Sequence, residues 1–112
     1  MMAKSSNAAL AALADPTREK IVRLLLQGER SVGEIAERVP VSRPAVSKHL
    51  RQLENAGLVT FRSFATRNVY AVEPAALQAL RDELNRMWEQ ALARYALVAN
   101  NRAAKRVARS RR

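Results

Sequence analysis

The sequence predicts a mainly α-helical domain that carries one β-hairpin, an α+β fold, and three observations lead to this prediction. Apolar residues recur at three- and four-residue spacing in several segments. Proline, glycine and small polar residues stand where those segments begin and end. Two alternating segments, 58–63 and 68–73, lie a few residues apart. The length of 112 residues suits one domain, placed at 1–99 and followed by a basic tail at 100–112.

The first two helices are defined by their ends. Residues 7–14 are an Ala/Leu run that predicts a short helix. Asp15 can cap a second helix, and Pro16 takes its first position, where a missing N–H costs nothing. This helix stops at Gly28, and its apolar residues are Ile21, Val22, Leu24 and Leu25.

The third helix is predicted at 31–39. Ser31 and Glu34 fit a capping box, in which a hydroxyl and a carboxylate each satisfy a free backbone N–H. The helix ends before Pro40, because proline lacks the N–H that a helix needs. Its inward residues are Val32, Ile35, Ala36 and Val39.

The fourth helix is predicted at 43–56, between Ser42 as its cap and Gly57 as its stop. Pro44 lies in the first turn, where proline is tolerated. The inner face at helical spacing is formed by Val46, Leu50 and Leu53.

The remaining elements are a hairpin and one long helix. Residues 64–67 join the two predicted strands, and Pro74 opens the last helix. The helix carries a wide apolar stripe for a terminal element, made of Leu77, Leu80, Leu84, Met87 and Ala91, with Trp88, Leu92 and Tyr95 beside it.

Charge and composition limit the classes of function. Lysine and arginine total 20 against 10 acidic residues, and the net charge of +10 favours phosphate-rich partners over an anionic membrane surface, the competing interpretation. Because the chain has no cysteine and a single histidine, disulfides and thiolate metal sites are excluded, and we expect neither a metal nor a cofactor.

The start of the chain faintly resembles a secretory leader, because Lys4 precedes the apolar residues 8–14. Those residues run directly into the helix-start signal Asp15–Pro16, which contradicts that interpretation. No run approaches the roughly 20 apolar residues of a membrane-spanning helix. We therefore expect a cytoplasmic protein with no membrane partner.

The helices at 31–39 and 43–56, joined by a three-residue turn, make a helix-turn-helix, and the following hairpin makes it winged. Residues four apart on one face of the second helix can donate to phosphates or to guanine edges in the major groove; they are Arg43, Ser47 and Arg51. Flanking positions suited to the DNA backbone are Ser42 and Lys48. A solvated face is the alternative, but the turn, hairpin and charge favour double-stranded DNA.

Two further positions have open roles. His49 borders the apolar edge of the fourth helix, which favours a packed or capping imidazole over a DNA contact. A catalytic His49 would need a nucleophile, and none is near in the sequence, so we predict no enzyme. Arg62 and Arg67 flank the hairpin tip, where they suit minor-groove or phosphate contact, although simple solubility of the tip explains them equally well.

The apolar stripe of the last helix predicts a homodimer, with folding back onto the core as the alternative. A symmetric dimer would hold two reading helices about 34 Å apart, one turn of DNA. The predicted interface comprises Leu10, Leu13, Leu77, Leu80, Leu84, Met87, Trp88, Ala91 and Tyr95.

The tail at 100–112 is basic, without an acidic residue, and we expect it to be disordered without a partner. A protein that relied on this tail would be a non-specific architectural DNA binder, which is the main alternative function. RNA binding is disfavoured, because the aromatic stacking surface usual for single strands is lacking.

Four stretches together resemble the ArsR family of bacterial winged-helix repressors, over about residues 8–98: ALADPTREKIVRLL, GERSVGEIAERV, VSRPAVSKHLRQLENAGLV and RNVYAVEP. The resemblance implies a homodimer joined through the first and last helices, a recognition helix at 43–56 and a wing at 58–73. It also implies a sequence-specific transcriptional repressor, often acting on its own promoter, that a signal releases.

The chain departs from the metal-sensing members of that family. Those relatives carry a Cys-x-Cys in the third-helix region, where this chain has Ser31 and Gly33. Others place His and Asp ligands on the last helix, and residues 75–99 contain no His. The resemblance therefore implies a metal-independent member, controlled by its abundance, by a small molecule or by a partner protein.

Overall fold

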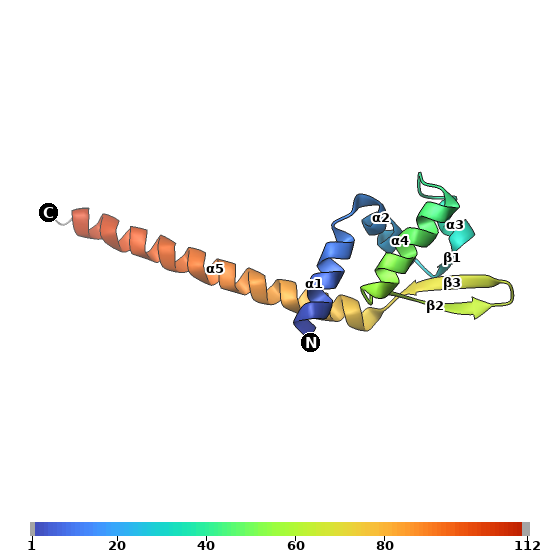
Figure 1. The fold of residues 1–112 in the computed structure, drawn as a ribbon. Helices are drawn as coiled ribbons and strands as arrows, with labels where there is room; N and C mark the ends of the chain where they lie inside the picture. The colour runs from blue at the N-terminus through green and yellow to red at the C-terminus, as the bar shows by residue number, and fades with distance from the viewer. Residues whose placement is uncertain (1, 111–112) are drawn as a thin grey trace. The chain divides into compact units, whose positions relative to one another are not determined.

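The computed structural model describes residues 2–110, with side-chain placement for residues 6–103. It divides the chain into two units, Met1–Leu80 and Arg81–Arg112. The first unit contains α1 (Met2–Leu13), α2 (Pro16–Leu26), β1 (Arg30–Ser31), α3 (Val32–Ala36), α4 (Arg43–Asn55), β2 (Val59–Phe64) and β3 (Arg67–Val72), and Pro74 begins α5 (Pro74–Ser110). Figure 1 shows these elements in order.

Helix α1 begins at Met2, earlier than the predicted residue 7, whereas the starts of α2, α3 and α4 follow the caps that the sequence predicts. The Asp15 carboxylate accepts the Arg18 N–H at 2.9 Å and caps α2. Ser31 and Glu34 form the predicted capping box, since each side chain accepts a backbone N–H from the other residue. The Ser42 hydroxyl accepts the Ala45 N–H at 3.3 Å and begins α4.

The end of α4 is fixed by a glycine. Gly57 has a φ of 78°, in the left-handed region that other residues rarely adopt. Its N–H donates to the Glu54 carbonyl at 2.9 Å, and the Leu58 N–H donates to the Leu53 carbonyl at 3.0 Å. This paired arrangement is a Schellman motif, which satisfies the last carbonyls of the helix and turns the chain into β2.

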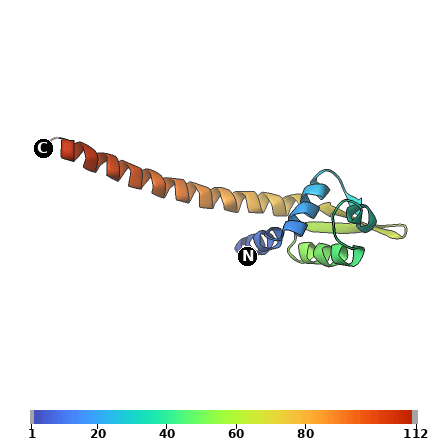
Figure 2. The same ribbon diagram turned by 90° about the horizontal axis from the view of Figure 1, so that it is seen from above.

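The sheet has three antiparallel strands in the order β1-β3-β2. In the hairpin, Val59 pairs with Val72 and Phe64 with Arg67, and β1 adds Arg30 opposite Tyr70. Figures 1 and 2 show β1, β2 and β3 beside the helices of the first unit, and the chain contacts place α2 on β3 and α4 on β2.

The core of the first unit is aliphatic. The side chains with no exposed surface are Ile21, Ile35, Val46, Leu50, Leu53 and Leu58. They come from α2, α3, α4 and the residue before β2, so one cluster joins the helix-turn-helix to the wing. The predicted inner face of α4 is confirmed, because all three of its residues belong to this cluster.

Several element boundaries differ from the predictions. α3 ends at Ala36 instead of residue 39, and residues 37–39 form a turn, because Pro40 disfavours the α conformation of the residue before it. The turn to α4 is correspondingly longer than three residues. The strands extend toward the tip, to 59–64 and 67–72, and leave a two-residue turn at Ala65 and Thr66. Strand β1 was not predicted at all.

The last helix also extends further than predicted. α5 runs to Ser110, so residues 100–110 are helical where the sequence predicted a disordered tail, and residues 111–112 lie outside the described part. No proline or glycine follows Pro74, and alanine and arginine are strong helix formers. The predicted division into a domain at 1–99 and a tail at 100–112 stays a prediction. Within residues 2–110, no helix has the length and apolar character needed to cross a membrane.

Candidate nucleic-acid interface

The polar face of α4 is open to solvent. Arg43, Lys48 and Arg51 are exposed, and Ser47 is half-buried between them. The opposite face is held by fully buried leucines and a valine, so packing fixes which side of α4 points outward. The structure therefore places the predicted reading residues on one free surface of the first unit.

Ser42 stands at the start of this surface. Its oxygen accepts the Ala45 N–H, which leaves its own O–H free to donate to an anion. Arg51 is exposed on α4, and its charge acts on Tyr70 of β3. Burial raises the pKa of the Tyr70 phenol, Glu54 adds to the increase and Arg51 opposes it.

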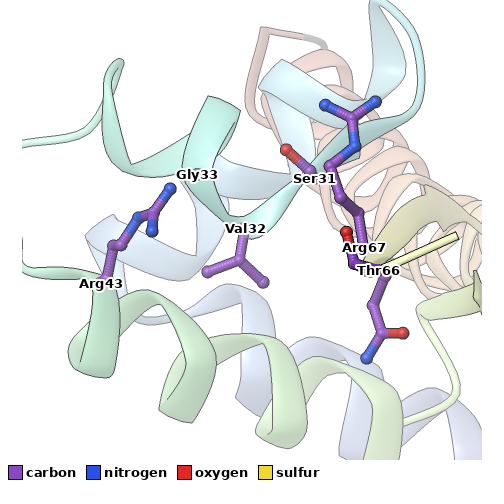
Figure 3. Close-up of a pocket in the computed structure, with 7 residues that line it drawn as sticks. Ser31, Val32, Gly33, Arg43, Thr66 and Arg67 are labelled. Atoms are coloured by element: carbon purple, nitrogen blue, oxygen red, sulfur yellow. The ribbon is translucent and has the colours of Figure 1, made fainter. Parts of the chain in front are cut away.

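Arg43 has a specific position that the sequence did not indicate. Its guanidinium lies against Gly33 of α3, where a Cβ built on the glycine would come within 2.2 Å of a guanidinium nitrogen. Figure 3 shows Arg43 reaching from the start of α4 toward Gly33. The only signal in the sequence was a glycine inside the first turn of a helix, which is unfavourable without a packing reason.

The two wing arginines occupy different places. Arg67 pairs with Phe64 across the two-residue turn, so it stands at the tip as predicted. Arg62 pairs with Val69, further along the hairpin, and its guanidinium donates to the carboxylate of Glu29. The expectation that both arginines flank the tip is therefore wrong for Arg62, because the strands extend beyond it.

The turn itself is conformationally unusual. Ala65 has a φ of 57°, a value at which a Cβ is crowded by its own backbone. Beside it, Phe64 keeps 63% of its surface exposed. Neither a glycine nor an Asn-Gly pair marks the turn in the sequence, so the residue types do not predict the left-handed φ of Ala65.

His49 lies on the packed side of α4. Its Nδ1 atom is 4.0 Å from the Asp15 Oδ2 atom and, among the described residues, this nitrogen has no hydrogen-bond partner. The backbone N–H of Arg18 lowers the pKa of Asp15 most. Desolvation, the next-largest effect, raises the pKa, and the charge of Arg18 adds a smaller reduction. This position agrees with the packed imidazole that the sequence favoured.

The residues predicted for a dimer interface fall into two groups. Leu80 is 6% exposed and belongs to the core of the first unit, while Leu10, Leu13 and Leu77 pack partly against that core. In α5, the large side chains that remain exposed include Leu84, Met87, Trp88 and Tyr95, and Ala91 is exposed with them. The alternative of folding back onto the core therefore holds for Leu77 and Leu80, and the homodimer stays a prediction for the exposed residues.

No group of three or more His, Cys, Asp or Glu side chains that could hold a metal ion occurs in the part of the chain that the structure describes.

Comparison with known proteins identifies the family to which this sequence is similar. Residues 15–60 match the model of the bacterial regulatory protein, arsR family. The chain is 50% identical over 98 residues to the HTH-type transcriptional regulator Rv2034 of Mycobacterium tuberculosis, covering 88% of this chain and 92% of that protein. It is 37% identical over 82 residues to the transcriptional activator HlyU of Vibrio cholerae, covering 73% and 76%.

Solved structures of related regulators have the same fold as this chain. An ArsR-like transcriptional regulator from Rhodococcus sp. RHA1 superposes with a TM-score of 0.74 at 32% sequence identity, over 84% of this chain and 89% of that one. A structure described as a possible transcriptional regulator for arsenical resistance gives a TM-score of 0.67 at 38% identity, over 76% and 93%.

Proposed function

Because the chain belongs to the ArsR family and is a DNA-binding transcriptional regulator, we propose that it represses transcription as a homodimer on a two-fold symmetric operator. The observation that carries this proposal is the exposed polar face of α4 beside the wing. Ser47 and Arg51 read base edges in the major groove, and Ser42 and Lys48 hold the backbone. Arg67 contacts DNA from the wing tip, and Arg43 does so from the start of α4.

The exposed apolar side chains of α5 support the dimer. Leu84, Met87 and Trp88 are each at least 44% exposed, and a contiguous apolar surface of this kind marks an interaction site. A second copy of the chain is the partner that gives an operator its two-fold symmetry. Leu80 is excluded from this interface, since it is already buried in the core.

Repression is the favoured direction of control, with activation as the second candidate. One relative is named a transcriptional repressor, SdpR of Bacillus subtilis, and another is named an activator, HlyU. We further propose that control is independent of metal, because Ser31 and Gly33 occupy the positions that would need thiolates. The signal is then a small molecule, a partner protein or the abundance of the regulator, and the protein itself catalyses no reaction.

Selection of bound duplexes from a random DNA pool, followed by footprinting upstream of the protein's own gene, tests the proposal. We expect one two-fold symmetric sequence, protected over both half-sites, and lower transcription from the footprinted promoter when the protein is present. Binding that remains indifferent to sequence would instead favour an architectural protein that relies on its basic C-terminal residues. Higher transcription would replace repression by activation and leave the DNA-binding function intact.

A further inference from the structure

A cavity of about 310 Å³ lies where α3, α4 and the wing tip come together. A water molecule in the liquid occupies roughly 30 Å³, so the cavity has room for about ten waters, which is more space than one phosphate group needs. All of its lining belongs to the first unit of the chain and is shown in Figure 3: Ser31, Val32, Gly33, Arg43, Thr66, Arg67 and Asn68.

Two guanidinium groups flank this cavity from different elements. Arg43 comes from the first position of α4 and Arg67 from the first position of β3, on either side of Val32 and Gly33 (Figure 3). Within the described residues, neither arginine has an ion-pair partner, in contrast to Arg62 and Arg23. Two arginine side chains without an ion-pair partner in that part of the chain line one hollow, and this surplus of positive charge favours an anionic occupant.

The polar lining also presents donors. The Ser31 oxygen accepts the Glu34 N–H and the Asn68 Oδ1 atom accepts the Ser63 O–H at 2.9 Å. Both contacts leave the O–H of Ser31 and the NH₂ of Asn68 free to donate. Glu34 is the nearby negative charge, and its carboxylate is held in the capping box by the Ser31 N–H, which lowers its pKa. Two arginines thus outweigh one carboxylate that is already hydrogen-bonded.

Gly33 determines where Arg43 can be. A Cβ at this position would lie 2.2 Å from one guanidinium nitrogen of Arg43 and 3.2 Å from its central carbon. The far end of a flexible side chain would simply move away, so alanine would displace Arg43 without disturbing the backbone. The φ of Gly33 lies outside the left-handed region, so alanine fits the local conformation.

We propose that this cavity is a phosphate site that clamps one backbone phosphate of the bound DNA between the start of α4 and the wing, with Gly33 as the positioning residue that keeps Arg43 in its wall. This inference rests on the proposed DNA-binding function and makes it more specific. Arginine suits the role, because its planar fork donates two parallel hydrogen bonds to one oxyanion. Arg43 therefore fixes the register of α4 on the duplex instead of reading a base.

A double-mutant cycle tests the role of Gly33. Gly33→Ala should leave the melting temperature unchanged or raise it, because alanine favours a helix over glycine. It should weaken binding to the selected operator about tenfold, the loss expected for one charge-assisted hydrogen bond. In an Arg43→Gln background the same substitution should have no further effect. An equal loss in both backgrounds, or no loss in either, would contradict the positioning role.

A set of operator duplexes tests the clamp. In each duplex a neutral methylphosphonate replaces one phosphate of the DNA backbone, at a different position. Arg43→Gln and Arg67→Gln should each weaken operator binding about tenfold. In each half-site, one neutral linkage should remove the penalties of both substitutions, because both arginines lose the same partner. Arg23→Gln, an equal change of charge on α2, should show no such dependence. Two separate linkages, or none, would overturn the clamp.

Titration with inorganic phosphate at constant ionic strength separates the two sources of phosphate. We expect saturable NMR shifts of the Gly33 and Thr66 amides that disappear in Arg67→Gln and in the operator complex. Saturation that persists when the operator is bound would assign the cavity to a free anion and contradict the DNA clamp. Absence of any saturable shift would contradict the phosphate site itself. Because this measurement needs no operator, it also decides the cavity if sequence-specific binding fails.

Discussion

The Nδ1 atom of His49 lies 4.0 Å from the Oδ2 atom of Asp15, so the only imidazole of the chain faces the carboxylate that begins α2. The same carboxylate accepts the Arg18 N–H at 2.9 Å. Arg18 in turn donates through Nε to the Ala12 carbonyl at 2.7 Å and through a terminal nitrogen to Gln52 of α4 at 2.6 Å. Polar contacts therefore join α1, α2 and α4.

Replacing the cap of α2 should lower stability. Asp15→Ala removes the acceptor for the Arg18 N–H, and we expect the melting temperature to fall by several degrees. Asp15→Asn keeps an oxygen acceptor and should lose much less. Thermal unfolding followed by circular dichroism at pH 7 measures both. Equal losses for the two variants would show that charge, and not capping, is the contribution of Asp15.

The same residue should give a pH dependence with a definite sign. The folded state lowers the pKa of Asp15, first through the Arg18 N–H, so the charged carboxylate stabilises the fold. At pH values above about 4, the usual pKa of an Asp side chain in the unfolded state, this stabilisation is complete. As the pH falls through the lower pKa that Asp15 has in the folded state, the stabilisation is lost. Unfolding profiles between pH 2 and 7 should thus be shallower at the acid end for Asp15→Asn than for the wild type. Identical acid profiles would contradict the assignment.

Truncation of the α4 core should be severe. Leu50 has no exposed surface, and Leu50→Ala should reduce the free energy of unfolding by about 2–5 kcal/mol. Leu26→Ala makes the same chemical change on α2 at a side chain that is 58% exposed, and should cost far less. Urea denaturation of both variants gives the comparison. A small loss at Leu50 would mean that α4 is not anchored as the structure shows.

Arg51 should contribute to operator affinity and little to folding. It is exposed on α4, so Arg51→Ala should cost about 1–3 kcal/mol in operator binding if it contacts a base. Fluorescence anisotropy with the selected operator and with single-base variants measures the loss and its base dependence. An unchanged affinity would remove Arg51 from the reading set.

Removing Glu29, the ion-pair partner of Arg62, should strengthen DNA binding instead of weakening it. Arg62 must leave Glu29 to reach a phosphate, and an exposed pair of this kind is worth roughly 0.2–1 kcal/mol. Glu29→Gln should therefore tighten binding to all sequences by a factor of up to about five, while Arg62→Gln weakens it and reduces the salt slope by about one. Binding titrations across salt concentrations test both changes. If Glu29→Gln leaves affinity unchanged, Arg62 belongs to the protein surface and not to the DNA contact.

Trp88 offers a direct measure of the proposed dimer. It is the only tryptophan in the sequence and is 67% exposed in the single chain. Burial against a second copy should shift its emission to shorter wavelength, and the shift should reverse on dilution. Leu84→Glu should weaken the dimer at least about tenfold, because a carboxylate would be buried unpaired. Leu26→Glu is the control, and sedimentation that shows only monomer in the wild type would refute the dimer.

Much of the fold could be predicted because its signals are local. Asp15, Ser31 and Ser42 each hold the cap that their residue types and spacing indicate, and Gly57 ends α4 as its conformational freedom requires. The inner face of α4 follows from helical periodicity alone. The residues proposed to bind DNA could be chosen because the same periodicity leaves one face polar.

The remaining features depend on contacts that periodicity does not encode. Strand β1 is two residues long and exists only because β3 lies beside it. Ala65 in the turn adopts a left-handed φ although it is not a glycine, so the residue types in the sequence do not predict this turn conformation. The position of Arg43 over Gly33 joins two helices across a turn, and only the folded chain brings these residues together.

Strand β1 also limits how this scaffold could be re-engineered. Arg30 and Ser31 pair with Tyr70 and Val69, and Ser31 is at the same time the cap of α3. A hairpin grafted from a relative would have to preserve that register, since a slip of one position would turn Ser31 over and uncap the helix. Exchanging wings to alter DNA preference is thus feasible for the two turn residues and the outer strand, but the inner strand must be transplanted together with the segment at 30–34.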